Sequence, residues 1–90
     1  MRIEWKEGKR KSNLAKHGLD FSDASKVFYG PEFTLLDDRF EYPEPRFQTY
    51  GQLNERLVMI AWTPIPDGKH VISMRKCNDR EKGKFASKLG

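Results

Sequence analysis

Seven polar residues of this chain have side chains that could act together on a phosphodiester bond. Histidine titrates near neutral pH and can transfer protons, while arginine presents a planar fork that matches phosphate oxygens. RNA can be cleaved by such groups without a metal: a base removes the 2′-hydroxyl proton, cations stabilise the charged phosphate, and an acid protonates the leaving oxygen. The candidates are Lys16, His17, Arg46, Arg75, Lys76, Arg80 and Glu81.

Several of these candidates also have a purely structural interpretation. His17 falls in the last turn of a predicted helix, where a cation interacts favourably with the helix dipole. Glu81 follows Asn78 by three residues, which is the spacing of a capping box. Arg46 and Arg75 lie on predicted strands beside polar neighbours, which favours the floor of a groove over a core. Residue types alone leave both the structural and the catalytic role open.

Other familiar catalytic and cofactor motifs are missing from the sequence. It contains no glycine-rich phosphate loop, no Gly-x-Ser-x-Gly turn and no His-Glu-x-x-His pair. Asp37 and Asp38 are adjacent acids in a proline-bounded loop, a pattern more typical of a solvated loop than of a metal site. The single cysteine, Cys77, excludes an internal disulfide and a multi-cysteine zinc cluster. We therefore expect no metal and no cofactor.

The charge of the chain is distributed unevenly. Its 90 residues carry a formal net charge of +4, with a pI near 9.3. Residues 1–20 hold six basic and three acidic side chains, residues 21–45 hold two and six, and residues 46–90 hold nine and four. Two basic arms around an acidic middle favour a polyanionic ligand for one surface and a basic partner for another. An ordinary solvated surface is the alternative.

The length predicts one domain over residues 1–90. The longest apolar run, residues 57–62, has six residues, against the roughly 20 that a membrane-spanning helix requires. The first residues have no apolar core typical of a secretory signal. We therefore expect a cytoplasmic protein that does not interact with membranes.

Hydrophobic periodicity predicts an α+β domain in the order β-α-α-β-β-β-β-α, with a small antiparallel sheet, two N-terminal helices and a C-terminal helix. Strands are expected at residues 2–5, 33–36, 46–51, 56–63 and 69–76, with turns at 52–55 and 64–68. Helices are expected at residues 7–17, from Asp20 to Gly30, and at residues 80–89.

Alternation within the strands predicts which side chains share a face. Arg46, Gln48 and Tyr50 should lie on one side of their strand. In the last strand, Val71, Ser73 and Arg75 should lie on one side, with Ile72 and Met74 on the other. In the C-terminal helix, Phe85 and Leu89 should stack one turn apart.

Short motifs recur in a characteristic order from about residue 3 to residue 85. They comprise Trp5, Lys9, Asn13, Lys16, His17, Gly18, Phe21, Ala24, Val27, Phe28, Arg46, Gly51, Ile72, Ser73, Met74, Arg75 and Glu81. In this order and spacing they resemble the BrnT family.

The resemblance implies a RelE-like fold and the toxin of a type II toxin–antitoxin pair. Such a toxin is a ribonuclease that arrests translation and growth. Its partners would be an RNA substrate and a BrnA-like antitoxin with a DNA-binding domain, and the toxin–antitoxin complex would bind its own operator DNA.

The family's functional positions map onto five of the candidate residues. The resemblance implies that Arg46 and Arg75 contact phosphate, that His17 or Glu81 transfers protons, and that Lys16 contacts the RNA backbone. The basic arms add further RNA-binding candidates, namely Lys9, Lys76 and Arg80.

The sequence departs from the family pattern at two positions. Lys6 stands where the family usually has Asp, which removes an N-cap from the first helix. Phe85 stands where the family often has Tyr, so it offers no phenol for proton transfer. Two alternatives to a nuclease therefore stay open: a non-catalytic nucleic-acid-binding module, and a regulator whose acidic segment, residues 37–44, docks a basic partner.

Overall fold

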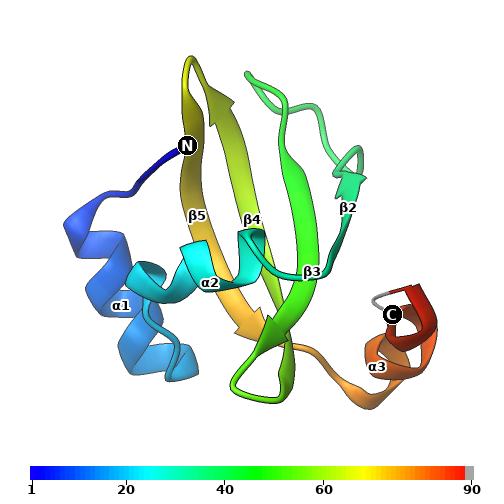
Figure 1. Cartoon of the computed structure of the whole chain (residues 1–90). Helices are drawn as coiled ribbons and strands as arrows, with labels where there is room; N and C mark the ends of the chain where they lie inside the picture. The colour runs from blue at the N-terminus through cyan, green and yellow to red at the C-terminus, as the bar shows by residue number, and fades with distance from the viewer. Residues whose placement is uncertain (89–90) are drawn as a thin grey trace.

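A five-stranded sheet forms the centre of the protein, seen in a computed structural model that describes residues 1–88 (Figure 1). The strands lie in the order β1-β5-β4-β3-β2. They are β1 (Arg2–Glu4), β2 (Glu32–Leu36), β3 (Phe47–Leu53), β4 (Arg56–Ile65) and β5 (Gly68–Lys76). The α+β class is therefore confirmed.

The sheet is mixed, and the prediction of an antiparallel sheet was wrong in this respect. Strands β2 to β5 form an antiparallel meander, but β1 pairs with β5 in parallel. Most of the chain lies between β1 and β5, so no tight turn forces these two strands to run in opposite directions.

The N-terminal helices follow local capping signals. Helix α1 (Glu7–His17) has the predicted bounds, and Gly18 closes it in the left-handed conformation with φ 69°. Lys6 occupies the N-cap and makes no side-chain capping bond. The second helix is shorter than predicted: a 3₁₀ turn (Phe21–Asp23), capped by Asp20, leads into α2 (Ala24–Phe28).

The C-terminal helix α3 (Asp79–Phe85) begins at the predicted capping box. Asn78 accepts a hydrogen bond from the Glu81 backbone N–H, and the Glu81 carboxylate accepts one from the Asn78 N–H. A 3₁₀ turn (Ala86–Lys88) follows. The predicted stacking of Phe85 with Leu89 lies outside the described residues.

The two faces of the sheet are covered differently. Helices α1 and α2 lie together, and α3 lies apart from them beyond the end of β5 (Figure 1). The covered face, packed against α2 and the 3₁₀ turn before it, holds an apolar cluster: Phe21, Ala24, Val27, Leu53, Val58, Ile60, Trp62, Val71 and Met74. The open face holds a smaller cluster at the α3 end: Tyr50, Leu57, Met59, Ala61, Cys77 and Phe85.

A β-bulge in β5 overturns the predicted facing of that strand. Trp62 pairs with Val71 and Ala61 pairs with Ser73, so Ile72 is an extra residue without a partner on β4. Val71 and Met74 therefore both reach the covered face, while Ser73 lies on the open face. The predicted facing of β3 is confirmed, because Tyr50 joins the open-face cluster and Phe47 packs against the covered one.

Candidate functional site

The clearest polar arrangement on the open face is an ion pair between Arg75 on β5 and Glu81 on α3. Arg75 Nη1 and Nη2 donate to Glu81 Oε1 and Oε2, each at 2.8 Å. The side chains are 35% and 16% exposed. Glu81 also serves the capping box, so its structural role is confirmed and coexists with the arginine contact. Two of the four predicted catalytic residues thus meet.

This pairing keeps both groups charged. The Arg75 hydrogen bonds, opposed by burial, lower the pKa of Glu81 to about 2. The same contact raises the pKa of Arg75. While Glu81 is paired in this way, it is a weak base and has no proton to donate at neutral pH.

A tyrosine that the sequence did not single out lies beside this pair. The Tyr50 ring stacks on Phe85 with centroids 4.1 Å apart, and its hydroxyl donates to Gln48 Oε1 at 3.1 Å. The hydroxyl also contributes to the low pKa of Glu81, while burial raises the pKa of Tyr50 itself. Alternation predicted the face of Tyr50, but its partners come from distant parts of the chain.

The open face continues from Gln48 to a buried carboxylate. Gln48 Nε2 donates to Asp37 Oδ2 at 3.4 Å, and Arg39 Nε and Nη2 donate to the same carboxylate at 2.9 Å each. The Asp37 side chain is 1% exposed, and Arg39 lowers its pKa to about 2. The interpretation of Asp37 as a solvated loop acid was therefore wrong. Among residues 1–88, no cluster of three His, Cys, Asp or Glu side chains could hold a metal.

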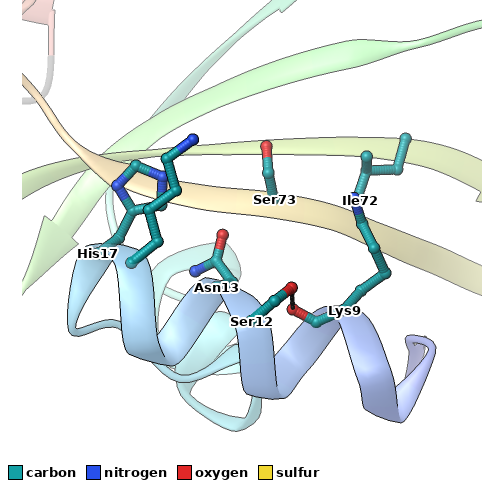
Figure 2. Close-up of a pocket in the computed structure, with 7 residues that line it drawn as sticks. Lys9, Ser12, Asn13, His17, Ile72 and Ser73 are labelled. Atoms are coloured by element: carbon teal, nitrogen blue, oxygen red, sulfur yellow. Dashed lines mark hydrogen bonds between the residues drawn. The ribbon is translucent and has the colours of Figure 1, made fainter.

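His17 lies in a pocket between α1 and the edge of β5 (Figure 2). The pocket is lined by Lys9, Ser12, Asn13, Lys16, His17, Ile72 and Ser73. Ser73 and Arg75 occupy the same face of β5 two residues apart, about 7 Å along the strand. Ser73 therefore links the His17 pocket to the face of β5 that carries Arg75.

Asn13 holds α1 against β5 at this pocket. Its Oδ1 accepts the Met74 backbone N–H at 3.1 Å, and its Nδ2 donates to the Leu19 carbonyl at 3.2 Å. Strand β1 pairs only as far as His70, so the β5 edge beyond it is occupied by this helix. Asn13 belongs to the family motif, but helical periodicity alone does not distinguish it from a solvent-exposed residue.

Arg46 lies in a second hollow rather than with Arg75. The lining residues are Lys6, Lys9, Glu44, Arg46, His70, Val71 and Ile72, so the hollow shares Lys9 and Ile72 with the His17 pocket. The Arg46 guanidinium lies 4.0 Å from the Tyr42 ring centroid. Its Nε is buried and has no hydrogen-bond partner among residues 1–88.

The remaining cationic candidates are not gathered with these residues. Lys76 pairs with Val58, a covered-face residue, and lines a hollow with Gly18 and Asn54. Arg80 is exposed on α3. The Cys77 thiol is buried, which raises its pKa to about 11 and leaves it a poor nucleophile at neutral pH.

The chain belongs to the family described as the ribonuclease toxin, BrnT, of type II toxin–antitoxin systems, whose model matches residues 5–81. The matched range contains α1, the His17 pocket, Arg46 and the Arg75–Glu81 pair. Membership implies a toxin role and an antitoxin partner. No curated protein matches the chain. None of the helices within residues 1–88 has the length and apolar character to cross a membrane.

Proposed function

We propose that this BrnT-family toxin cleaves RNA without a bound metal and thereby inhibits translation, with Arg75 and Glu81 at the reaction centre. The supporting observation is the bidentate Arg75–Glu81 pair on the open face, which Ser73 of the His17 pocket also occupies. Arginine binds phosphate in the same two-pronged geometry that it uses for carboxylate. The pair is therefore a site that an RNA phosphate can enter by replacing the carboxylate.

Replacement of the Glu81 carboxylate by phosphate also allows Glu81 to act as the base. When a phosphate binds the Arg75 guanidinium, Glu81 loses the hydrogen bonds that contribute most to its low pKa. Its burial, which raises the pKa, remains. Glu81 can then accept the 2′-hydroxyl proton. The 2′ oxygen attacks phosphorus, the bond to the 5′ oxygen breaks, and a protonated His17 gives that oxygen its proton. The products are a 2′,3′-cyclic phosphate and a 5′-hydroxyl.

The adjoining hollows supply a path for the rest of the RNA. Lys16 and Lys9 lie along α1 beside His17, and Lys9 leads to the hollow that holds Arg46. Cations that follow the backbone bind single-stranded RNA with little sequence preference. In this proposal Arg46, Lys9 and Lys16 hold flanking phosphates, and Lys76 and Arg80 lie outside this path.

Purified protein incubated with RNA in excess EDTA tests this proposal. We expect cleavage products that end in cyclic phosphate, and a loss of about 100- to 1000-fold in kcat for Arg75→Gln, because one stabilising contact to the charged phosphate is removed. Glu81→Gln should lose activity to a similar extent. Arg56→Gln, at an exposed position at the start of β4, is the matched control and should cleave normally.

Two results would contradict the nuclease proposal. Intact RNA after incubation with the folded wild-type protein is one, and full activity of a folded Arg75→Gln variant is the other. Circular dichroism of each variant separates loss of activity from loss of fold.

A non-catalytic RNA-binding toxin is the second candidate, favoured by Phe85. This position offers no hydroxyl, and its ring packs on Tyr50. Binding alone would give salt-dependent retention of RNA with no product, because cation–phosphate contacts release counterions. Gel analysis of the bound RNA distinguishes the two functions.

The broader context of the proposal is a RelE-like toxin in the cytoplasm, neutralised by a BrnA-like antitoxin whose complex with it binds operator DNA. Type II membership supports the antitoxin; the BrnA-like identity follows from the resemblance. Expression of the toxin alone should arrest growth, and co-expression of its antitoxin should restore it. An operator fragment should be shifted by the complex and not by the toxin alone.

A further inference from the structure

The two edges of the sheet differ in what covers them. Beyond β1, the edge of β5 is covered by α1, where Asn13 Oδ1 accepts a hydrogen bond from the Met74 N–H. At the other edge, β2 pairs with β3 on one side only. The five residues of β2 contain no proline and no lysine, the residues that commonly protect an exposed edge.

The hydrogen-bond alternation of β2 shows which backbone groups are free to pair. The Asp37 N–H donates to the Arg46 carbonyl, which continues the β2–β3 ladder. In an antiparallel ladder every second residue bonds to the neighbouring strand. Thr34 and Leu36 therefore direct their N–H and C=O groups away from β3, towards the outside of the sheet.

Exposed apolar side chains gather at this same edge. Leu35 and Leu36 on β2 are 37% and 59% exposed, and Tyr29 and Phe40 on its two flanks are 70% and 67% exposed. Elsewhere in residues 1–88, the exposed large hydrophobic side chains are Met1 and Leu14. A concentration of apolar surface around an unpaired strand is typical of an interaction site.

The charges around β2 indicate which kind of partner would bind there. Glu32 begins the strand, and Asp38 and Glu41 lie in the loop just after it; all three are exposed. None of them forms an ion pair within residues 1–88. Although the protein has a net charge of +4, these unpaired carboxylates therefore gather beside β2. Complementary charge favours a basic partner.

We propose that an extended segment of the antitoxin, with alternating apolar and basic side chains, docks on β2 as a sixth strand of the sheet. Backbone bonds to Thr34 and Leu36 would hold the segment, and its basic side chains would face the three carboxylates of Glu32, Asp38 and Glu41. A second copy of the chain fits this edge poorly, because antiparallel pairing of two β2 strands brings Glu32 of each copy towards the acidic loop of the other. The inference rests on the toxin role proposed above.

Amide hydrogen exchange of the toxin, free and in complex with the antitoxin of its own operon, tests the proposal directly. The Thr34 and Leu36 amides should exchange at least about tenfold more slowly in the complex. A stable complex in which both amides exchange at the rate of the free toxin would overturn the proposal. Concentration-dependent protection of these amides in the toxin alone would also overturn it, in favour of pairing between two copies.

Matched variants separate the surface from the fold. Leu36→Asp should raise the Kd for the antitoxin by about tenfold or more, because it places a charge in the apolar centre of the contact. Leu14→Asp makes the same change on α1 and should leave the Kd within about twofold. Equal effects of the two variants would count against β2. These measurements need no RNA cleavage, so an inactive nuclease would leave the result interpretable.

Discussion

The covered and open faces of the sheet use their side chains for different purposes. On the covered face, Phe21, Val27 and Ile60 are fully buried, and the buried Thr49 hydroxyl accepts a hydrogen bond from Trp62. On the other side, α3 covers only one end, and the row from Asp37 through Gln48 and Tyr50 to Arg75 remains polar. In this small domain, most of the stabilising apolar burial therefore lies on one face, and the second face is available for binding.

Two consecutive residues of β3 show the same division. Thr49 is fully buried on the covered face, where its hydroxyl accepts the Trp62 indole N–H at 2.8 Å. Tyr50 points to the open face, donates to Gln48, and contributes to the low pKa of Glu81. Substitutions on the two faces should therefore separate stability from activity.

Removing a large side chain from the covered face should have the largest effect. Phe21→Ala should lower the free energy of unfolding by about 3–5 kcal/mol, a large share of the stability of a small domain, because it leaves a cavity beside Trp5 and the sheet. Urea denaturation measures the loss. Phe40→Ala, at a 67% exposed position, is the control and should change stability by less than about 0.5 kcal/mol.

Acid should weaken the open face specifically. The pKa values of Glu81 and Asp37 fall from 4.5 and 3.8 to about 2 in the folded protein. Depressed pKa values add stability above the unfolded values, and this stability is lost as pH falls from about 4.5 to 2. The loss should be about 2–3 kcal/mol for both groups together, about half of what ~1.4 kcal/mol per pKa unit gives, because solvent reaches both arginine partners. Denaturation across this range should show a shallower pH dependence for Glu81→Gln than for the wild type.

The Thr49 hydroxyl should matter for stability and not for activity. Thr49→Val keeps the shape but leaves the Trp62 N–H without its acceptor, so it should cost about 1–3 kcal/mol. Thr49→Ser keeps the hydroxyl and should cost less. A change in RNA cleavage by folded Thr49→Val protein would break the proposed division between the faces.

Tyr50→Phe should have the opposite pattern. It removes a hydroxyl that bonds to Gln48, so the free energy of unfolding should fall by about 1 kcal/mol or less. RNA cleavage should fall by about tenfold, because the hydroxyl contributes to the lowered pKa of Glu81, the proposed base. Unchanged kcat in a single-turnover assay would place Tyr50 in a structural role alone.

The smallest expected effect is a gain of stability in α3. Gly83 is exposed, and a Cβ atom there would contact nothing within 4 Å, so Gly83→Ala should add about 0.5–1 kcal/mol through helix propensity. Gly51 on the covered side of β3 is the contrast, because a Cβ there would lie 2.6 Å from Val27 Cγ1. Thermal denaturation should show a gain for Gly83→Ala and a loss for Gly51→Ala.

Elements specified by neighbouring residues were predictable from the sequence. The bounds of α1, its closure at Gly18 and the capping box of Asn78 with Glu81 each depend on residues within one helical turn. The hairpin between β3 and β4 was placed correctly but is tighter than predicted, with Asn54 and Glu55 at positive φ. Hydrogen bonds within one turn and backbone preferences depend on neighbouring residues, so they can be predicted from the sequence.

The sequence by itself determined the α+β class, the strand and helix order along the chain, and the residue types available for phosphate chemistry. The tertiary structure decided how those residues meet. The bulge at Ile72 arises from the pairing of β5 with β4, and the contacts of Glu81 with Arg75 and of Arg46 with Tyr42 arise from packing between separate elements. These contacts depend on register and on which element covers each face, and neither property is encoded in the spacing of nearby residues.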